Sequence, residues 1–269
     1  MLIRSTRNLL AALACASALA IAGCGGSDST TSTVPPSGTP TTPEVKTVVI
    51  TGVAATGAAF TGGVVSVIDS TGKVVGTSQP VGDDGVYSVT LADGATPPFV
   101  LVASRTTSTG ETQTLVSVVE SASVTTANVT PITTLIASRL SVSGDPAKLA
   151  EELAASQVQI TPEEVAATVQ EVKAILGPLL AASGTTDFDP LRDAFATNGS
   201  GYDQLLDSIS VSIVPAGTSA NIEVAVKSVG GEDANPPTIT FSSDQTLDTI
   251  VADNQISSTG IGGTTIDSS

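Results

Sequence analysis

The sequence predicts an α+β protein, with an N-terminal antiparallel β-sandwich, then a small helical subdomain, then a C-terminal β-hairpin. Three successive patterns of apolar spacing indicate this order. Short β-branched runs between Gly and Asp turns fill residues 46–129, apolar residues three and four apart follow over 130–208, and alternation resumes over 209–253. Each pattern has the period of one kind of secondary structure, so the fold class follows from the spacing.

The N-terminal segment has the layout of a secretory signal. Arg4 and Arg7 precede an almost wholly apolar run from Leu9 to Ala22, and small residues close it, as in signal peptides. The apolar run of about 14 residues is shorter than the roughly 20 that a membrane-spanning helix needs. We therefore interpret residues 1–23 as a cleaved signal peptide.

The signal ends in Ile21-Ala22-Gly23-Cys24. This motif resembles the lipobox of bacterial lipoproteins, in which an aliphatic residue and two small residues precede a cysteine. The resemblance implies cleavage after Gly23 and attachment of lipid, palmitate included, to Cys24. Stable anchoring requires more than one acyl chain, and lipoprotein anchors carry several. Residue 25 is Gly rather than the Asp that retains many enterobacterial lipoproteins at the inner membrane, so the analogy implies the outer membrane.

Residues 24–45 are expected to form a disordered tether. The segment consists mostly of Gly, Ser, Thr and Pro, and its only apolar residues after Cys24 are Val34 and Val45. Such a composition buries too little apolar surface to offset the entropy of ordering the chain. As a flexible coil, the tether would hold the fold roughly 25 Å from the membrane.

Residues 46–129 contain the strand signals of a β-sandwich. Runs rich in Val, Ile and Thr alternate with turns such as 69–72 and 83–85, where Asp and Gly supply turn chemistry. The predicted strands are 47–53, 64–68, 73–78, 86–91, 99–103 and 114–119, with 124–129 as a candidate seventh. Short strands at this spacing indicate two packed antiparallel sheets.

A set of glycines, turn residues and alternating valines recurs in this region. Its members are Gly52, Gly57 and Gly63, then Val65-x-Val67-x-Asp69 with Gly72-Lys73, then Asp84-Gly85-x-Tyr87-x-Val89. The set resembles the carboxypeptidase regulatory-like domain over about residues 47–105. The resemblance implies a seven-stranded transthyretin-like (prealbumin-like) sandwich. Members of that family are mostly accessory modules, so the resemblance brings no catalytic residue with it.

Four pairs of a capping residue and proline mark helix starts over residues 130–208. The pairs are Thr130-Pro131, Asp145-Pro146, Thr161-Pro162 and Asp189-Pro190. The capping oxygen accepts from a free backbone N–H, and proline needs no partner at the first helical position. Thr161 and Glu164 have the spacing of a capping box. Gly177-Pro178 is predicted to break the third helix, and Gly201-Tyr202-Asp203 to open a last short one.

The C-terminal region returns to alternation. Apolar residues alternate from Ile209 to Ile213 and from Ile222 to Val226, which predicts a half-buried antiparallel hairpin. Further strands are predicted at 237–241 and, more weakly, at 247–251. We expect residues 254–269 to form a poorly ordered tail, because Ser, Thr, Gly and Asp dominate there.

Composition excludes several classes of function. The chain carries 10 Lys and Arg against 26 Asp and Glu, and loss of residues 1–23 leaves eight basic residues. Nucleic-acid binding depends on Lys and Arg, so we expect no nucleic acid as partner. The chain has no His, which excludes a Ser–His–Asp triad and His-ligated metal sites. Cys15 lies in the signal and Cys24 carries the lipid, so neither a disulfide nor a cofactor is predicted.

A carboxylate-based glycan hydrolase is one alternative, because such enzymes pair an acid with a base. The acidic pairs are Asp83/Asp84, Glu151/Glu152, Glu163/Glu164, Asp187/Asp189 and Glu232/Asp233. Adjacent residues on a helix point about 100° apart, so neither Glu pair is expected to converge on one site. Glu163 and Glu164 have a structural explanation, since acidic side chains suit a helix start.

A calcium-dependent adhesion module is the other alternative, because calcium takes oxygen ligands. Weak candidate ligands are Asp83, Asp84, Asp187 and Asp189, which lie in predicted loops. Neither group has the spacing of the D-x-[DN]-x-[DN]-G calcium loop. A β-turn and a helix cap explain the same residues.

The order of segments resembles that of proteobacterial lipoproteins with the same layout, including a junction at 128–135 and a Gly-Ser-Gly-Tyr-Asp motif at 199–203. The resemblance brings no known activity. The sequence therefore predicts a non-enzymatic, lipid-anchored cell-envelope protein that serves in binding, adhesion or scaffolding. Its expected contacts are the membrane, through the N-terminal lipid, and an envelope protein or glycan of unknown identity.

Overall fold

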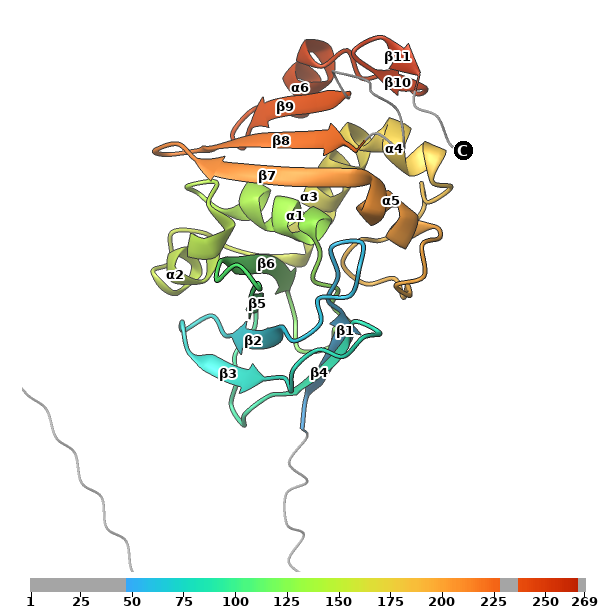
Figure 1. Cartoon of the computed structure of the whole chain (residues 1–269). Helices are drawn as coiled ribbons and strands as arrows, with labels where there is room; N and C mark the ends of the chain where they lie inside the picture. The colour runs from blue at the N-terminus through green and yellow to red at the C-terminus, as the bar shows by residue number, and fades with distance from the viewer. Residues whose placement is uncertain (1–46, 228–236, 266–269) are drawn as a thin grey trace, which may run out of the picture. The chain divides into compact units, whose positions relative to one another are not determined.

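A computed structural model describes residues 47–227 and 237–265, and these belong to one unit, Glu44–Ser269 (Figure 1). The predicted signal peptide, the Ile21–Cys24 motif and the whole of the tether lie outside the described residues, as does the Glu232/Asp233 pair. The described part has a mixed α+β architecture, with antiparallel sheets first, helices next and a three-stranded antiparallel sheet last.

Two antiparallel sheets form the N-terminal part. The two-stranded sheet pairs β1 (Val49–Val53) with β4 (Val86–Thr90). The four-stranded sheet has the order β3-β2-β5-β6, built from β2 (Val64–Ile68), β3 (Val74–Thr77), β5 (Phe99–Thr106) and β6 (Thr112–Val119). These six strands confirm the six predicted runs, because β-branched residues between Gly and Asp turns specify strands locally.

The candidate seventh strand at 124–129 is not a strand. The segment runs beside β1 and forms only isolated parallel bridges, Thr51 to Thr126 and Ala54 to Val129. The Val53 N–H donates to the side-chain oxygen of Asn128 at 3.3 Å. A side chain therefore occupies a position that a regular ladder would give to a backbone carbonyl.

Caps start the helices as predicted in three of four cases. Thr130 caps α1 (Pro131–Leu140), and Thr161 caps α3 (Pro162–Ile175) with the predicted capping box to Glu164. Asp145 caps a single 3₁₀ turn, Pro146–Lys148, which leads into α2 (Leu149–Ala154). Proline in the first turn of each element fits, because no N–H is needed there.

Two predictions about helix boundaries were wrong or incomplete. No helix follows Asp189-Pro190; the Asp189 carboxylate instead accepts the Leu191 N–H at 2.9 Å and closes a turn. Gly177-Pro178 does end α3, but it also opens α4 (Gly177–Ala182) at once. The last predicted helix is present as α5 (Tyr202–Ser208), with Leu205 and Leu206 buried.

The C-terminal sheet has the order β7-β8-β9. The predicted hairpin is β7 (Ile209–Pro215) with β8 (Ala220–Val226), and β9 (Thr238–Ser242) adds a third antiparallel strand. The strand predicted at 247–251 was wrong, because Leu247–Asp253 forms helix α6. Leu247, Ile250 and Val251 lie three and four apart, which is helical spacing.

The expectation of a poorly ordered tail was wrong for residues 254–265. They form a small hairpin of β10 (Gly260–Ile261) and β11 (Thr264–Thr265) after α6. Ile261 is buried in the main core. Ile261 makes an apolar contact with the core that the polar composition of this segment did not predict.

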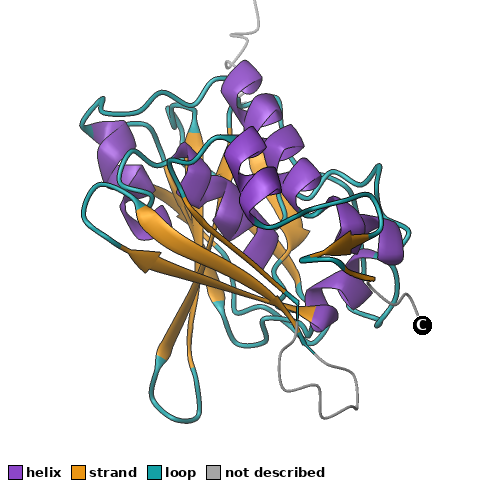
Figure 2. Ribbon diagram, turned by 90° about the horizontal axis from the view of Figure 1, so that it is seen from above, coloured by secondary structure: helices purple, strands orange, loops and turns teal. Residues whose placement is uncertain are grey.

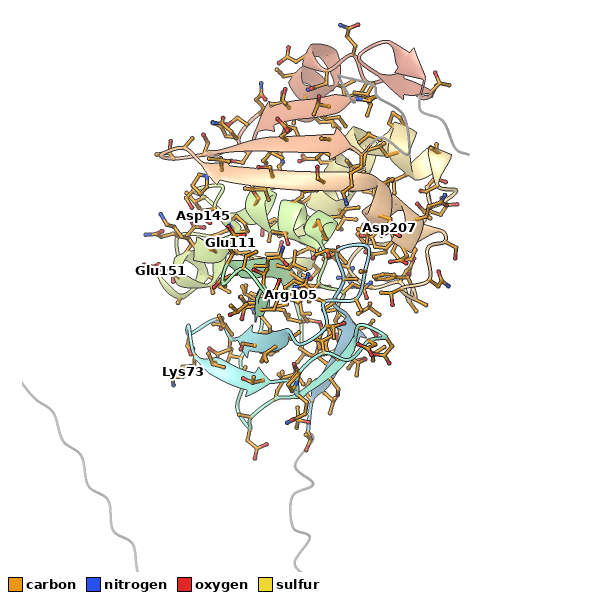
Figure 3. The ribbon with its side chains drawn as sticks, viewed as in Figure 1. Lys73, Arg105, Glu111, Asp145, Glu151 and Asp207 are labelled. Carbon is orange, nitrogen blue, oxygen red and sulfur yellow. The ribbon has the colours of Figure 1, made fainter. Side chains whose placement is uncertain are left out.

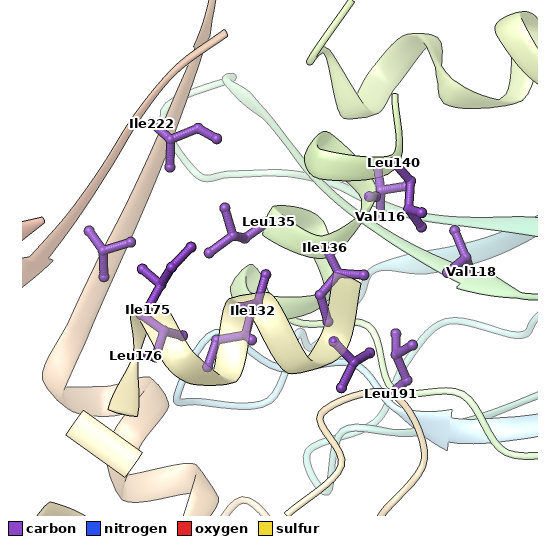
Figure 4. Packing of buried hydrophobic residues seen from close by; sticks show 14 of the residues in the cluster. Val116, Val118, Ile132, Leu135, Ile136, Leu140, Ile175, Leu176, Leu191 and Ile222 are labelled. Carbon is purple, nitrogen blue, oxygen red and sulfur yellow. The ribbon is translucent and has the colours of Figure 1, made fainter. Parts of the chain in front are cut away.

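Helix α1 lies between the two larger sheets. Strand β5 and the end of β6 are buried on both faces of the four-stranded sheet: Leu101 of β5 packs toward β1 and β4, whereas Val100 and Val116 pack toward the helices. On its other side, α1 contacts the C-terminal sheet, where Ile222 belongs to the same core cluster (Figures 1 and 4). Viewed from above, the helices lie to one side of the long strands (Figure 2). The helical part and the hairpin thus share a core with one face of the four-stranded sheet, whereas its other face forms a second core with β1 and β4.

Buried threonines join α1 to β6. The Thr133 hydroxyl donates to the Val116 carbonyl at 2.8 Å and accepts from the Thr130 N–H at 2.8 Å. The Thr134 hydroxyl accepts from the Val116 N–H at 2.9 Å. Side chains of α1 therefore satisfy backbone groups of a strand, which fixes where the helix lies on the sheet.

Replacing Thr133 by valine tests this junction. Thr133→Val keeps the shape but leaves the buried Val116 carbonyl and Thr130 N–H with fewer partners, so the free energy of unfolding should fall by about 2 kcal/mol. Urea denaturation measures it. Thr168→Val is the matched control, because the Thr168 hydroxyl bonds only to the Glu164 carbonyl of its own helix. Equal losses in the two variants would contradict a special role for the junction.

Candidate binding surface

The outer face of the β7-β8-β9 sheet is a regular surface that faces solvent. Side chains alternate along the three strands, so one face packs on the core and the other faces solvent. Across the strands the register aligns Ser212 with Glu223 and Thr240. All three of these side chains are exposed. The next row aligns Val214 with Asn221 and with Ser242 of β9.

This face contains a shallow depression of about 390 Å³. Its lining comes from Ser212, Val214, Asn221, Ile222, Glu223, Thr240 and Phe241. The side chains of Ile222 and Phe241 belong to the core, so the chemistry of the depression comes from hydroxyls, one amide and the Glu223 carboxylate. Such groups can donate and accept hydrogen bonds. No aromatic ring among the lining residues is available on this face for stacking against a sugar.

Arginine 139 fixes this sheet to the helices. Its guanidinium donates to the carbonyls of Ser243 and Gln245, both at 2.7 Å, at the turn that follows β9. It also pairs with Glu171 of α3 at 2.7 Å. One arginine of α1 thereby holds the end of β9 and the neighbouring helix together, which positions the candidate surface.

Two of the four calcium candidates, Asp84 and Asp189, have local structural roles. Asp83 and Asp84 lie exposed in the turn before β4, where the Asp84 carboxylate accepts the Val86 N–H at 3.0 Å. Asp187 is exposed, and Asp189 closes its turn and pairs with Arg192 at 3.3 Å. In the described ranges, no three Asp, Glu, His or Cys residues come together as a metal site. The calcium hypothesis remains a prediction.

In each acidic pair on a helix, one carboxylate has a structural role and the other is exposed. Glu164 accepts the Thr161 N–H at 2.9 Å in the capping box, and Glu163 lies exposed in the same first turn. Glu151 points into solvent (Figure 3), whereas its neighbour Glu152 is 5% exposed. The two members of this pair thus face different environments, as the 100° separation of neighbours on a helix requires.

Glu152 is bound by the loop that follows α1. Its carboxylate accepts from the hydroxyls of Ser141 and Ser143 at 2.8 and 2.5 Å, and from the N–H groups of Val142 and Ser143, both at 3.0 Å. Burial alone would raise the pKa of Glu152, but these four donors stabilise the ionised form and lower the pKa overall. Sequence reasoning identified Glu152 only as half of a pair.

Asp203 is a buried carboxyl that sequence reasoning named only as a helix start. It is 2% exposed, and one oxygen accepts the Gly199 N–H at 2.7 Å. Its other oxygen has no partner among the described residues. Burial raises the pKa of Asp203, and the negative charge of Asp207 raises it further, against the opposing Gly199 bond.

An aromatic cluster adjoins this helix start. Tyr202 stacks on Phe188 with ring centroids 4.2 Å apart, and Phe195 meets both rings edge-on. Burial raises the pKa of Tyr202. Three of the seven aromatic residues of the chain therefore stabilise the segment before α5, where they are packed together rather than exposed for a ligand.

No known protein-family model matches the chain, and no curated protein sequence or solved structure shows significant similarity to it. Within residues 47–227 and 237–265, none of the helices has both the length and the apolar character needed to cross a bilayer. The candidate surface is therefore argued from its own residues.

Glu152→Gln should destabilise the protein in a pH-dependent way. At pH 7 the amide cannot accept from all four donors, so the free energy of unfolding should fall by about 2 kcal/mol. Because the folded pKa is lowered, the contribution of Glu152 is present above its unfolded pKa of about 4.3 and is lost as pH falls through the folded pKa. Urea denaturation at pH 7 and pH 3 should show the difference from the parent shrinking at low pH.

Asp203→Asn is the control with the opposite sign. Because the folded pKa of Asp203 is raised, its contribution is present below an unfolded pKa of about 3.9 and is lost as pH rises through the folded pKa. The stability of this variant relative to the parent should therefore increase from pH 3 to pH 7. The same pH trend in both variants would show that these carboxyl environments are wrongly assigned.

Proposed function

We propose that this chain is a non-enzymatic, lipid-anchored cell-envelope protein that binds a partner through the outer face of its C-terminal sheet. The observation that carries the proposal is that face: three in-register strands present exposed Ser212, Glu223 and Thr240. A polar sheet surface of this kind suits recognition by hydrogen bonds. The lipobox-like Ile21–Cys24 motif and the Ser/Thr/Pro-rich segment after it support attachment to a membrane, which we propose is the outer membrane.

The roles of the acidic residues support binding rather than catalysis. Glu152 and Glu164 satisfy backbone N–H groups, and Asp189 closes a turn. A glycosidase needs two carboxyls facing each other across a substrate, whereas these carboxyls each serve a different local structure. Among the partners expected for an envelope protein, a protein fits this face better than a glycan, because the depression offers hydrogen-bonding groups and no stacking ring.

A transthyretin-like identity of the sandwich is part of the proposal. Two antiparallel sheets with a shared core support it. So do the turn residues of the resemblance: the Asp69 carboxylate accepts the N–H groups of Thr71 at 2.9 Å and Lys73 at 3.2 Å. In this proposal the sandwich is a spacer and scaffold between the tether and the helical core.

The anchor is tested by metabolic labelling. Cells expressing the full chain are grown with radioactive palmitate, and the protein is immunoprecipitated. Label should be present on the parent and lost in Cys24→Ala. Cys15→Ala is the matched control and should keep its label, because Cys15 lies inside the predicted signal. Label retained in Cys24→Ala would overturn the anchor.

The binding face is tested by photocrosslinking in intact cells. A photoreactive amino acid at Asn221, on the outer face, should give a discrete crosslinked protein. The same amino acid at Lys73, an exposed residue of the β2–β3 turn far from the C-terminal sheet (Figure 3), is the control and should not give that product. No product at Asn221, or the same product from both positions, would contradict the assignment of this face.

A further inference from the structure

The C-terminal sheet has two edges, and β7 forms one of them. The strand order is β7-β8-β9, so β7 pairs only with β8 (Figure 1). A strand at the edge of a sheet turns a row of backbone N–H and C=O groups outward, where another chain can pair with them. Whether another chain pairs with these backbone groups therefore bears on the function of the protein.

The register shows which groups point outward. Hydrogen bonds from Ala216 N to Ser219 O and from Lys227 N to Ser208 O, both 2.7 Å, continue the β7–β8 ladder at its two ends. Because hydrogen-bonded pairs alternate along an antiparallel ladder, the even-numbered residues of β7 bond to β8. Val211 and Ile213 therefore turn their backbone groups to the free edge. In the described part of the chain these groups have no hydrogen-bond partner.

The opposite edge, at β9, is covered. The Asn254 side chain accepts the Thr240 N–H at 2.7 Å and donates to the Thr240 carbonyl at 2.9 Å, as a paired strand would. The Gln245 side chain accepts the Ser242 N–H at 2.8 Å. Side chains thus bond to the backbone of one edge of this sheet, whereas no side chain among the described residues bonds to the outward backbone groups of Val211 and Ile213.

The sequence of β7 is symmetric and uncharged. Residues 209–213 read Ile-Ser-Val-Ser-Ile, a palindrome centred on Val211, in a chain whose net charge is −16. Edge strands that avoid pairing usually carry Lys or another charge, and β7 has none. Val211 and Ile213 are only half-buried, so apolar surface remains beside the free backbone groups.

We propose that the β7 edge pairs with the β7 edge of a second copy of this chain, antiparallel and about a two-fold axis at Val211. The palindrome then places Ile209 opposite Ile213 of the other copy, and Ser210 opposite its Ser212. The backbone N–H and C=O groups of Val211 point to the free edge, so the two copies of Val211 form a hydrogen-bonded pair. Two three-stranded sheets then become one sheet of six strands. The absence of charge matters because any charge at the axis would face its own copy.

Other registers fit less well. Centring the axis on Ser212 would place Pro215 opposite Ile209, and proline has no N–H to donate to the new ladder. Shifting by one residue would bring outward groups opposite inward ones and move the side chains to the wrong faces. The Val211 register alone matches backbone direction, side-chain faces and sequence symmetry together.

Disulfide trapping in the purified full chain tests the register. Hydrogen-bonded antiparallel pairs have Cα atoms about 5.5 Å apart, within the range that a disulfide spans. Val211→Cys should therefore form a covalent dimer under mild oxidation in detergent, seen on a non-reducing gel. Ile213→Cys is the matched control: it lies two residues from the axis and should not exceed the background given by the parent. Val211→Cys dimers no more abundant than those of Ile213→Cys would overturn the proposal.

A charge at the edge provides a second measurement that does not depend on a cysteine. Ser212 and Thr240 are both exposed and lie in one row of the sheet, on the two edge strands. Ser212→Asp should raise the dimer dissociation constant at least tenfold in sedimentation equilibrium, whereas Thr240→Asp should leave it unchanged. A parent that is monomeric at all concentrations, or a Val211→Cys adduct that in cells contains only a different protein, would overturn pairing between copies.

The pairing does not rest on the proposed function. It is measured on purified protein, whereas the anchor and the binding face are tested in cells. Loss of the dimer with an intact Asn221 product, or the reverse, would separate the two proposals.

Discussion

Helix α1 lies between two β-sheets, and none of its ten residues is fully exposed. A helix enclosed in this way must satisfy every polar group it brings into the core, since an unpartnered buried group costs about 1–3 kcal/mol. Thr133 and Thr134 do so by bonding to β6. Arg139 does so through its terminal nitrogens, which bond to the turn after β9 and to Glu171, whereas its buried Nε has no partner among the described residues. The same side chains that make the helix compatible with the core therefore also fix the distance between the two sheets.

Because α1 joins the two sheets, packing in the core sets the position of the candidate surface. The inner face of the C-terminal sheet packs Ile222 and Val224 onto the helices, which leaves the outer face to solvent. The outer face is polar because it faces solvent, whereas the inner face packs on the core. Ionisable groups elsewhere in the described chain serve the same framework: Glu152 holds the loop after α1, and Glu171 balances Arg139. These structural roles are consistent with the binding role that we propose.

Local signals in the sequence predicted most elements. Capping pairs at Thr130 and Thr161 started helices, because the cap and proline act within one turn. The pair at Asp189-Pro190 has the same chemistry and starts none. There the carbonyls of Pro190 and Leu191, which a helix would use, accept hydrogen bonds from Asn128, a residue some 60 positions earlier. Asn128 decides the outcome, and no local window contains it.

The sequence by itself determined the mixed α+β class, the six N-terminal strands and the hairpin, because their apolar periods and turn residues are local properties. It also determined the absence of His and the lipobox-like motif at Cys24. Only the tertiary structure decided which carboxyls are buried and which edge of the C-terminal sheet is covered. These depend on contacts that no short window of sequence contains: Glu152 becomes a buried acceptor only when the loop after α1 folds over it, and the β9 edge is covered only when the Asn254 side chain reaches Thr240.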